Sequence, residues 1–374
     1  MDAIVAGAGI WGCTVARRLA EAGRKVLVLE KRAAVGGNCR CETDPETGIE
    51  VHTYGSHIFH TKDEKVWAFV NRFVRFNDYR HCVLASHAGR IYHLPFGRTL
   101  YDEFFGKGRY ELPLNDQQNA AIFDAFVKHY TAKQWGMDAE KVDPAVIKRL
   151  KVRDNYSTDY FDDPYQGIPI DGYNALFERM LDHPNITIRC NCELTLDGDR
   201  VKVRGEGEQG INQAIQQPGN PTIYYSGPID ALFDYRYGPL PWRTLRFEME
   251  KLPVRDYQGN SVVNYPDIDV PYTRIHEFRH YHPEKEVEGR PRDKTIVMRE
   301  YSGAWKQGDE PYYPISNPES AALLAKYQAE AAKFPALVIG GRLGQYKYFD
   351  MDKSVAAALA VQLASAGEDG PKIQ

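Results

Sequence analysis

The residues whose spacing most clearly suggests chemistry are glycines near the start of the chain. Gly7, Gly9 and Gly12 form a G-x-G-x-x-G motif, with Ile10 and Trp11 before the third glycine. In this motif the first glycine permits a tight turn, the second lets a diphosphate approach the backbone, and the third lets a helix pack closely on a strand. The N–H groups at the start of that helix bind the same anion. The motif predicts a dinucleotide-binding turn.

Residues that follow the motif favour FAD over NAD. Glu30 ends the next apolar run, where a carboxylate accepts hydrogen bonds from both ribose hydroxyls of a dinucleotide. The chain continues through Lys31 to Gly36, Gly37 and Asn38. This E-x5-G-G continuation resembles the FAD-binding branch of the fold, so we expect these residues to bind FAD.

A second glycine-containing segment, far along the chain, supports the same cofactor. Ile339, Gly340, Gly341 and Arg342 precede a helix that is expected near residue 352. In the FAD-binding branch the last helix directs its N-terminus toward the flavin. The partial positive charge at a helix N-terminus favours the anionic reduced flavin. The alternative is that Gly340 and Gly341 only end a strand.

The elements that must hold these residues begin with a β-α-β unit. Residues 2–6 and 25–30 are short apolar runs typical of buried parallel strands, and residues 14–22 between them predict a helix. Residues 62–135 have a mainly helical pattern. Residues from about 186 to 300 predict strands, because β-branched and aromatic residues alternate between turn signals. A helix, a short strand and a last helix follow.

We therefore predict a multidomain protein of mixed α/β and α+β class. A Rossmann-like FAD-binding domain is built from separated segments, with an inserted helical domain and an antiparallel β-sheet domain. The predicted boundaries are 1–61, about 186–230 and 332–374 for the FAD-binding domain, about 62–150 for the helical substrate or lid domain, and about 151–185 and 231–331 for the sheet domain.

The composition argues against several other classes of protein. The 374 residues carry a net charge of −4, which gives no general affinity for nucleic acid or anionic membranes. No apolar stretch is long enough to span a membrane, and the N-terminal residues lack the features of a signal peptide. The six cysteines include two C-x-C pairs, but structural zinc sites use wider spacing, so we predict no metal site. Reduced cysteines fit a cytoplasmic location.

A motif of histidines and aromatic residues points to a known family. Residues 52–61, HTYGSHIFHT, closely resemble a signature of bacterial UDP-galactopyranose mutases. Further similar segments follow in the same order along nearly the whole chain. They are YTAKQWG at 130–136, IKRL at 147–150, QGIP at 166–169, GY at 172–173, GPID at 227–230, PYTR at 271–274, PYYP at 311–314, GRL at 341–343 and YFDMD at 348–352.

The resemblance implies an isomerase that interconverts UDP-galactopyranose and UDP-galactofuranose and requires reduced FAD. In that family the electron-rich N5 of the reduced flavin attacks the anomeric carbon of the sugar, so that UDP is expelled and later recaptured. The protein positions the reactants and stabilises charge. The resemblance also implies a homodimer, a cellular reductant such as NAD(P)H, and a product that supplies cell-surface glycans.

Cations and hydroxyl groups are needed to hold the leaving diphosphate. The family motifs imply that Arg149 and Arg274 supply the charge, and that the hydroxyls of Tyr160, Tyr313 and Tyr348 donate to the phosphates. Without the resemblance, Arg149 would be interpreted as a solvated helix residue and Arg274 as a strand residue in a salt bridge.

Further aromatic residues are expected near the nucleotide. Phe126 and Tyr130 lie one helical turn apart and are expected to cover the uracil, although core packing would explain them equally simply. Trp135 precedes a glycine where the helical pattern breaks. It is expected on a lid that closes over UDP, and the alternative is a fixed surface anchor.

The histidines of the signature are candidate catalytic residues. The resemblance places His57 or His60 beside the flavin and the sugar, as a hydrogen-bond donor near N5 or the galactose hydroxyls. A structural role is the alternative for either one. Asn264 is expected near the substrate, and Asp350 and Met351 are expected near the flavin together with Arg342.

Other functions remain open from the sequence. One is a mutase for a related sugar such as UDP-N-acetylgalactosamine, and another is an FAD-dependent amine oxidase or dehydrogenase. An oxidase has no need for two arginines and several tyrosines around a diphosphate. A flavin-free regulatory protein of the same fold is disfavoured by the intact glycine turn and Glu30.

Overall fold

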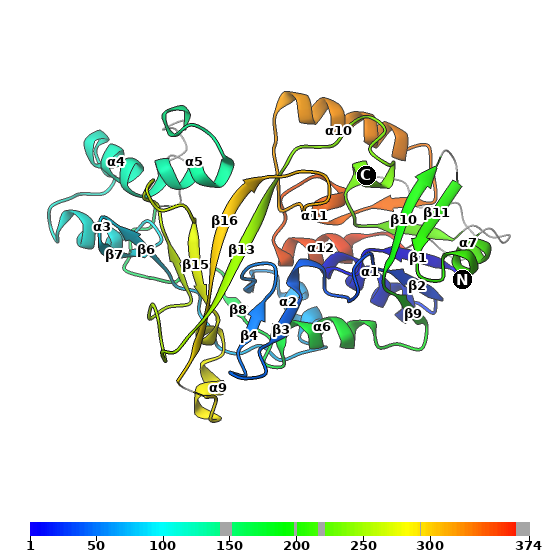
Figure 1. Cartoon of the computed structure of the whole chain (residues 1–374), viewed down its shortest axis with the longest axis horizontal. Coiled ribbons are helices and arrows are strands. Elements are labelled where there is room, and N and C mark those ends of the chain that lie inside the picture. The colour runs from blue at the N-terminus through cyan, green and yellow to red at the C-terminus, as the bar shows by residue number, and fades with distance from the viewer. Residues whose placement is uncertain (143–151, 198–199, 216–220, 292, 364–374) are drawn as a thin grey trace.

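Two β-sheets occupy opposite parts of the molecule (Figure 1). The computed structural model describes residues 1–142, 152–197, 200–215, 221–291 and 293–363. The smaller of the two sheets lies with the N-terminus and the last helix at one end, and the larger sheet extends toward a group of helices at the other end.

The first sheet has five parallel strands in the order β18-β12-β1-β2-β9. Its strands are β1 (Ala3–Ala6), β2 (Val26–Leu29), β9 (Ile186–Arg189), β12 (Thr222–Tyr225) and β18 (Leu337–Ile339). The β-α-β unit predicted at the N-terminus is therefore completed by strands from distant parts of the chain. This arrangement confirms the Rossmann-like fold built from separated segments.

Both faces of this sheet are buried, which explains why its strands are continuous apolar runs. Val5 and Val28 pack on one face with three helices, whereas Ile4 and Leu27 pack on the other face. The helices on the first face are α1 (Ile10–Glu21), α6 (Gly172–Leu181) and α12 (Met351–Ala360). The second face is covered by α8 (Ile229–Leu232), α10 (Pro318–Ala331) and the hairpin of β10 (Cys192–Asp197) and β11 (Arg200–Gly205), beside which lies α7 (Glu208–Ile215).

The larger sheet has seven strands in the order β17-β13-β16-β15-β14-β6-β7. They are β6 (Val83–His87), β7 (Arg90–Leu94), β13 (Trp242–Leu252), β14 (Val262–Asn264), β15 (Arg274–Glu277), β16 (Thr295–Ala304) and β17 (Tyr313–Pro314). All pairings are antiparallel except that of β14 with β6. The β6–β7 hairpin lies in the segment that was expected to be helical. Its pairing with β14 is long-range, and local periodicity cannot predict it.

The other elements of that segment are helices, as expected. It contains α2 (Glu64–Val70), α3 (Arg98–Phe105), α4 (Asp116–Ile122), a π-helix (Phe123–Lys128) and α5 (His129–Trp135). Asn115 and Gln118 form a capping box that starts α4. The π-helix has one more residue per hydrogen-bonded turn than an α-helix, so it changes the direction of every side chain that follows it. The sequence pattern predicted a regular helix through this region.

The remaining elements of the described ranges are short. They are η1 (Gly37–Cys39), β3 (Cys41–Thr43), β4 (Glu50–His52), β5 (Phe59–Thr61), η3 (Ala139–Lys141), β8 (Tyr165–Gly167), η5 (Phe278–Tyr281), α9 (Pro283–Val287) and α11 (Gly341–Gly344). Strand β3 pairs with β4, and β5 pairs with β8.

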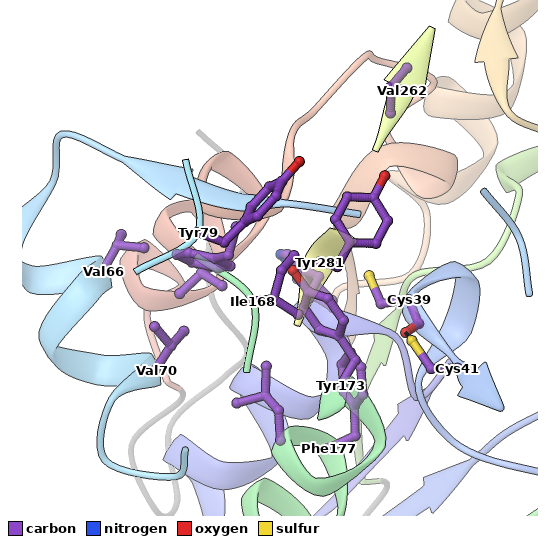
Figure 2. Packing of buried hydrophobic residues seen from close by; sticks show 14 of the residues in the cluster. Cys39, Cys41, Val66, Val70, Tyr79, Ile168, Tyr173, Phe177, Val262 and Tyr281 are labelled. Atoms are coloured by element: carbon purple, nitrogen blue, oxygen red, sulfur yellow. Dashed lines mark hydrogen bonds between the residues drawn. The ribbon is translucent and has the colours of Figure 1, made fainter. Parts of the chain in front are cut away.

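One buried cluster runs from the helices of the first sheet to the strands of the second (Figure 2). Tyr173 and Phe177 of α6 lie in it beside Ile168 and Tyr281, and Val262 of β14 belongs to the same cluster. Each of these side chains is almost fully buried. Because the core is continuous, residues contributed by the two sheets keep a fixed relative position.

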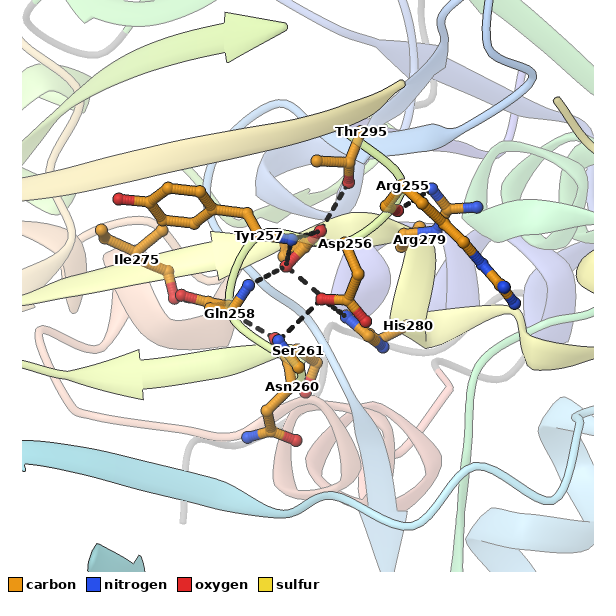
Figure 3. Close-up of polar contacts among 12 residues, drawn as sticks. Arg255, Asp256, Tyr257, Gln258, Asn260, Ser261, Ile275, Arg279, His280 and Thr295 are labelled. Atoms are coloured by element: carbon orange, nitrogen blue, oxygen red, sulfur yellow. Dashed lines mark hydrogen bonds and ion pairs between the residues drawn. The ribbon is translucent and has the colours of Figure 1, made fainter. Parts of the chain in front are cut away.

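Polar contacts around Tyr257, Gln258 and Thr295 hold the loop between β13 and β14 (Figure 3). Glu277 accepts hydrogen bonds from the backbone N–H groups of Tyr257 and Gln258 and from the hydroxyl of Thr295. Glu277 is fully buried, so these bonds compensate for the loss of hydration of its charge. The contact fixes the end of β15, the strand that begins with Arg274.

Candidate active site

A long cavity follows the carboxyl edge of the five-stranded sheet and the loops beyond it. Its empty volume is about 1150 Å³ when the open solvent at its mouth is included. The glycine turn and Glu30 line one part of it, and His57 and Met351 line another. The predicted cofactor residues that line it are Gly7, Gly9, Ile10, Trp11, Glu30, Lys31, Gly37, Asn38, His57, Arg342 and Met351.

The glycine turn has the shape that a dinucleotide requires. A Cβ atom on Gly12 would lie 1.9 Å from the carbonyl oxygen of Gly7, so only glycine allows this packing of α1 on the turn. Gly7 has a φ of 103°, which favours glycine as well. A Cβ atom on Gly9 would meet only the Cα of Gly37, 3.9 Å away. The face of Gly9 is thus open toward the cavity, which suits a diphosphate at the start of α1.

Glu30 is placed for the ribose end of the cofactor. Its carboxylate accepts hydrogen bonds from the N–H groups of Ala8 and Arg32, at 2.8 and 2.9 Å, which hold it at the cavity wall. Each oxygen keeps a second lone pair for a ribose hydroxyl. The side chain of Arg32 donates to Asn38 and to Glu310, and this holds Asn38 at the cavity as well. The polar lining at this end therefore fits the adenosine part of FAD.

The other end of the cavity carries positive potential and a histidine. Met351 begins α12, so the N-terminus of this helix lies at the cavity wall. Asp350 precedes the helix but accepts no capping hydrogen bond from the described backbone. Arg342 donates to the carbonyl oxygen of Phe349, which holds its guanidinium at the same end. An arginine and a helix N-terminus fit a flavin that becomes anionic when it is reduced.

His57 is neutral in the folded protein. Burial, followed by the nearby His52, lowers the pKa of His57 to about 3. Its Nδ1 lies 2.6 Å from the carbonyl oxygen of Gly55, so the neutral ring carries its proton on Nδ1. The Nε2 atom is then a hydrogen-bond acceptor. An acceptor at Nε2 differs from the expectation that His57 is a hydrogen-bond donor near N5 or the galactose hydroxyls.

Arg274 lies at the start of β15 beside the helical region. Its Nη2 donates to the hydroxyl of Tyr130 at 2.8 Å, and its Nε lies 3.1 Å from a carboxylate oxygen of Glu300. Burial alone would lower the pKa of Arg274, but the charge of Glu300 and the hydroxyls of Tyr130, Tyr313 and Tyr160 hold it well above its ordinary value. Arg274 is therefore a permanent cation in a partly buried site.

Aromatic side chains connect Arg274 with the flavin end of the cavity. The ring of Tyr348 stacks on Tyr313 with 6.0 Å between centroids, and the centroid of Trp135 lies 6.4 Å from that of Tyr313. The guanidinium of Arg342 lies 4.5 Å above the ring of Tyr348. Tyr348 is about half exposed. The structure thus brings these predicted substrate residues together beside the cavity.

A buried polar chain behind Arg274 was not foreseen. Glu300 accepts from His276 at 3.0 Å, and the other ring nitrogen of His276 lies 2.5 Å from the hydroxyl of Ser56. Tyr281 donates to the same hydroxyl. The chain connects Arg274 to the residue directly before His57. The sequence offered one signal, the charged pair of Arg299 and Glu300 inside an apolar strand, but it gave no partner.

Other predicted substrate and catalytic residues do not line the cavity, or they lie outside the described residues. Asn264 is opposite Arg274 in the sheet, and its Oδ1 is buried without a hydrogen bond from any described residue. Phe126 packs in the helical region against His87, Tyr92 and Phe104, a setting typical of a core residue. His60 pairs with Asp163 and stacks on Phe161, and it does not line the cavity. Arg149 lies outside the described residues.

Two groups of side chains in the described ranges have metal-ligand composition. In the group of Asp256, Glu277 and His280, Glu277 already accepts three hydrogen bonds from the protein. In the group of Cys41, Glu50 and His52, the Nδ1 of His52 accepts from the N–H of His57. The Nε2 of His52 therefore carries the proton and has no lone pair for a metal. We assign no metal to either group.

Comparison with known proteins agrees with this geometry. The family model of UDP-galactopyranose mutase matches residues 125–348, and that of an NAD(P)-binding Rossmann-like domain matches residues 5–73. A probable UDP-galactopyranose mutase of Klebsiella pneumoniae is 36% identical over 95% of this chain and 92% of its own length. A dTDP-fucopyranose mutase of Escherichia coli is also 36% identical, over 95% of this chain and 96% of its own length.

A solved structure described as reduced UDP-galactopyranose mutase has the same fold. Its TM-score is 0.70 at 15% sequence identity, with 96% of this chain and 92% of that chain covered. In the part of the chain that the structure describes, no helix has the length and apolarity needed to span a membrane. The glycine turn, Glu30 and the positive end of the cavity fit FAD. The chain is thus an FAD-binding isomerase and belongs to the UDP-galactopyranose mutase family.

Proposed function

We propose that this enzyme interconverts UDP-galactopyranose and UDP-galactofuranose. The observation that carries the proposal is the direct contact between the cavity that fits FAD and the cluster that contains Arg274. Arg342 lines the cavity and stacks on Tyr348, which stacks on Tyr313. A sugar bound between the two would have its anomeric carbon facing the flavin and its diphosphate facing Arg274.

Reduced FAD, when bound, supplies a nucleophilic N5 for the anomeric carbon. The residues of the protein position the substrate and stabilise the charge of its diphosphate. Arg274 remains positively charged and holds the diphosphate when the bond to the sugar breaks. The hydroxyls of Tyr313 and Tyr348 donate to the same group without adding charge. Tyr130 was expected at the uracil, but its hydroxyl contacts Arg274, so we propose that it donates to the diphosphate instead. We also propose that Tyr160 and Arg149 take part, as the family motifs imply.

His57 and the helix N-terminus act at the opposite side of the sugar. The neutral ring of His57 offers an acceptor at Nε2, which suits an N–H or a sugar hydroxyl. The N-terminus of α12 and Arg342 favour an electron-rich flavin. The role of His60 beside the sugar stays a prediction.

Chromatography of the nucleotide sugars tests the proposal. The purified yellow protein is incubated with UDP-galactofuranose with and without dithionite, and the amount of UDP-galactopyranose is measured. Conversion only in the reduced sample is the expected result. A folded, reduced, flavin-containing sample that converts none of the UDP-sugar would overturn the proposal.

The same assay tests other candidate substrates. The identity to the dTDP-fucopyranose mutase equals that to the Klebsiella protein, so a dTDP-sugar is the competing candidate. UDP-N-acetylgalactosamine tests whether the site accepts a larger group at C2. Comparison of kcat/KM for the three sugars identifies the substrate, and the highest value is expected for UDP-galactofuranose.

We also propose that the enzyme works as a homodimer in the cytoplasm and that a nicotinamide nucleotide reduces its flavin. Light scattering of the purified protein tests the dimer. Anaerobic bleaching of the flavin absorbance by NADH or NADPH tests the reductant, and failure of both nucleotides would contradict it.

A further inference from the structure

Lys133 has an unusual set of partners. It lies on α5, and its ammonium group is within hydrogen-bonding distance of four backbone carbonyl oxygens. They belong to Tyr265, Asp267, Val270 and Tyr272, at 2.5, 2.9, 2.8 and 3.1 Å. An ammonium has three protons, so all of its hydrogen-bonding capacity is used by one segment of backbone.

The segment that Lys133 binds connects two parts of the substrate cluster. Residues 265–272 join β14, which ends at Asn264, to β15, which begins at Arg274. Lys133 lies one turn after Tyr130 on the same helix and two residues before Trp135. The lysine therefore attaches the helix that carries Tyr130 and Trp135 to the loop that positions Arg274.

Neighbouring contacts show that this end of α5 is held against the sheet. Arg243 of β13 donates to the carbonyl oxygen of Gln134 at 2.9 Å, and Ser302 of β16 donates to the same oxygen at 2.6 Å. These groups satisfy a carbonyl at the C-terminus of the helix, where a cation is favourable. The contact through the ammonium of Lys133 reaches the loop before Arg274.

The charge of Lys133 is maintained near neutral pH. Burial lowers the pKa of Lys133 to about 8, and the carboxylates of Asp267 and Asp269 oppose this lowering. Asp267 itself pairs with His87 and accepts from the N–H of Ala88, so it does not pair directly with the ammonium. The lysine has the carbonyl oxygens as its direct partners, and these are fixed by the path of the loop.

We infer that Lys133 is a positioning residue for substrate binding: it holds Tyr130 and Trp135 of α5 against Arg274 through the backbone of residues 265–272. The inference rests on the proposed function, because it assigns Arg274 and Tyr130 to the nucleotide diphosphate. A lysine is specifically suited to the task. Its compact tetrahedral ammonium donates to oxygens that converge on one point, whereas the planar guanidinium of arginine does not.

The test measures binding and turnover separately in the flavin-containing enzyme. In Lys133→Met, we expect the KM for the UDP-sugar and the Kd for UDP, measured by calorimetry, to rise at least about ten-fold. We expect kcat to change less, since the flavin cavity is untouched. Lys128→Met is the matched control, because Lys128 lies on the preceding turns and pairs at the surface with Glu140. Its KM is expected to stay at the wild-type value.

Two further variants separate positioning from simple stabilisation. Lys133→Arg keeps the charge and tests the geometry even where the methionine variant folds poorly, and we expect it to restore little of the affinity. Tyr130→Phe should weaken UDP binding less in the Lys133→Met background than in the wild type, because the two residues act through one contact.

The outcomes distinguish this inference from the proposed function. A lower thermal midpoint with unchanged KM and Kd in folded Lys133→Met would overturn the inference, as would wild-type affinity in Lys133→Arg or additive effects with Tyr130→Phe. If the wild-type protein itself binds no UDP, the proposed function fails instead.

Discussion

The guanidinium of Arg342 lies 4.5 Å above the ring of Tyr348, and the two residues join the cofactor cavity to the substrate cluster. Arg342 lines the cavity, whereas Tyr348 stacks on Tyr313 beside Arg274. The pair is held by the bond from Arg342 to the carbonyl oxygen of Phe349. A substitution of either residue is therefore expected to affect both the flavin and the bound substrate.

Removal of the Arg342 charge should make the flavin harder to reduce. In Arg342→Gln, the anionic reduced flavin loses a stabilising cation, so the midpoint potential should fall by roughly 30 mV or more, the equivalent of about 1.4 kcal/mol for two electrons. Spectroelectrochemical titration of the flavin measures this shift. Lys347→Gln is the control, since Lys347 is exposed and does not line the cavity. Equal potentials in Arg342→Gln and wild type would contradict the prediction.

The glycines of the turn should respond differently to the same substitution. In Gly9→Ala, the new methyl group enters the cavity without meeting the protein closely, so the variant should fold but bind FAD at least about ten-fold more weakly. In Gly12→Ala, the methyl group collides with the carbonyl of Gly7, and folding should fail.

The ratio of flavin absorbance to protein absorbance, with circular dichroism, distinguishes these cases. Gly210→Ala is the control, because nothing lies within 4 Å of the added Cβ. A Gly9→Ala protein with full flavin content would show that the diphosphate does not lie against this residue.

Arg274 should be needed for turnover. Arg274→Ala removes a charged hydrogen-bonding group and should lower kcat/KM at least about ten-fold. It also leaves the buried Glu300 without its cation, which should lower the free energy of unfolding by about 3 kcal/mol. Nucleotide-sugar chromatography and urea denaturation measure the two effects. Arg246→Ala, on the same sheet but exposed and paired with Glu248, should have neither. Full turnover in Arg274→Ala would remove Arg274 from the mechanism.

A buried histidine should make the fold less stable in mild acid. Burial, followed by the charge of Arg274, lowers the pKa of His81 to about 3, whereas the unfolded chain binds this proton near pH 6.5. Between these values the unfolded state binds more protons, so stability falls as the pH falls. From pH 7 to pH 5 the loss is about 2 kcal/mol for this residue.

The measurement is a comparison of urea midpoints at pH 7 and pH 5 for wild type and His81→Asn. The variant loses its bond to Tyr79 at both pH values, so that cost cancels in the difference. The drop in stability should be smaller in the variant. An identical drop in both proteins would show that His81 does not remain neutral.

The sequence by itself determined the cofactor turn and the family. The spacing of Gly7, Gly9 and Gly12 before a helix has a local steric cause, so the turn can be predicted without knowledge of the rest of the chain. The short apolar runs at the N-terminus likewise predicted buried parallel strands, because both faces of that sheet are covered.

Tertiary structure decided which residues meet when they are distant in sequence, because the local pattern contains no information on such contacts. Phe126 packs in the core against Phe104, whereas Tyr130, four residues later, meets Arg274, although a regular helix places both on one face. The β6–β7 hairpin joins the large sheet through a pairing with β14 that is distant in sequence. The partners of Lys133 are backbone carbonyls, which every residue type possesses, so only the path of the folded chain could identify them.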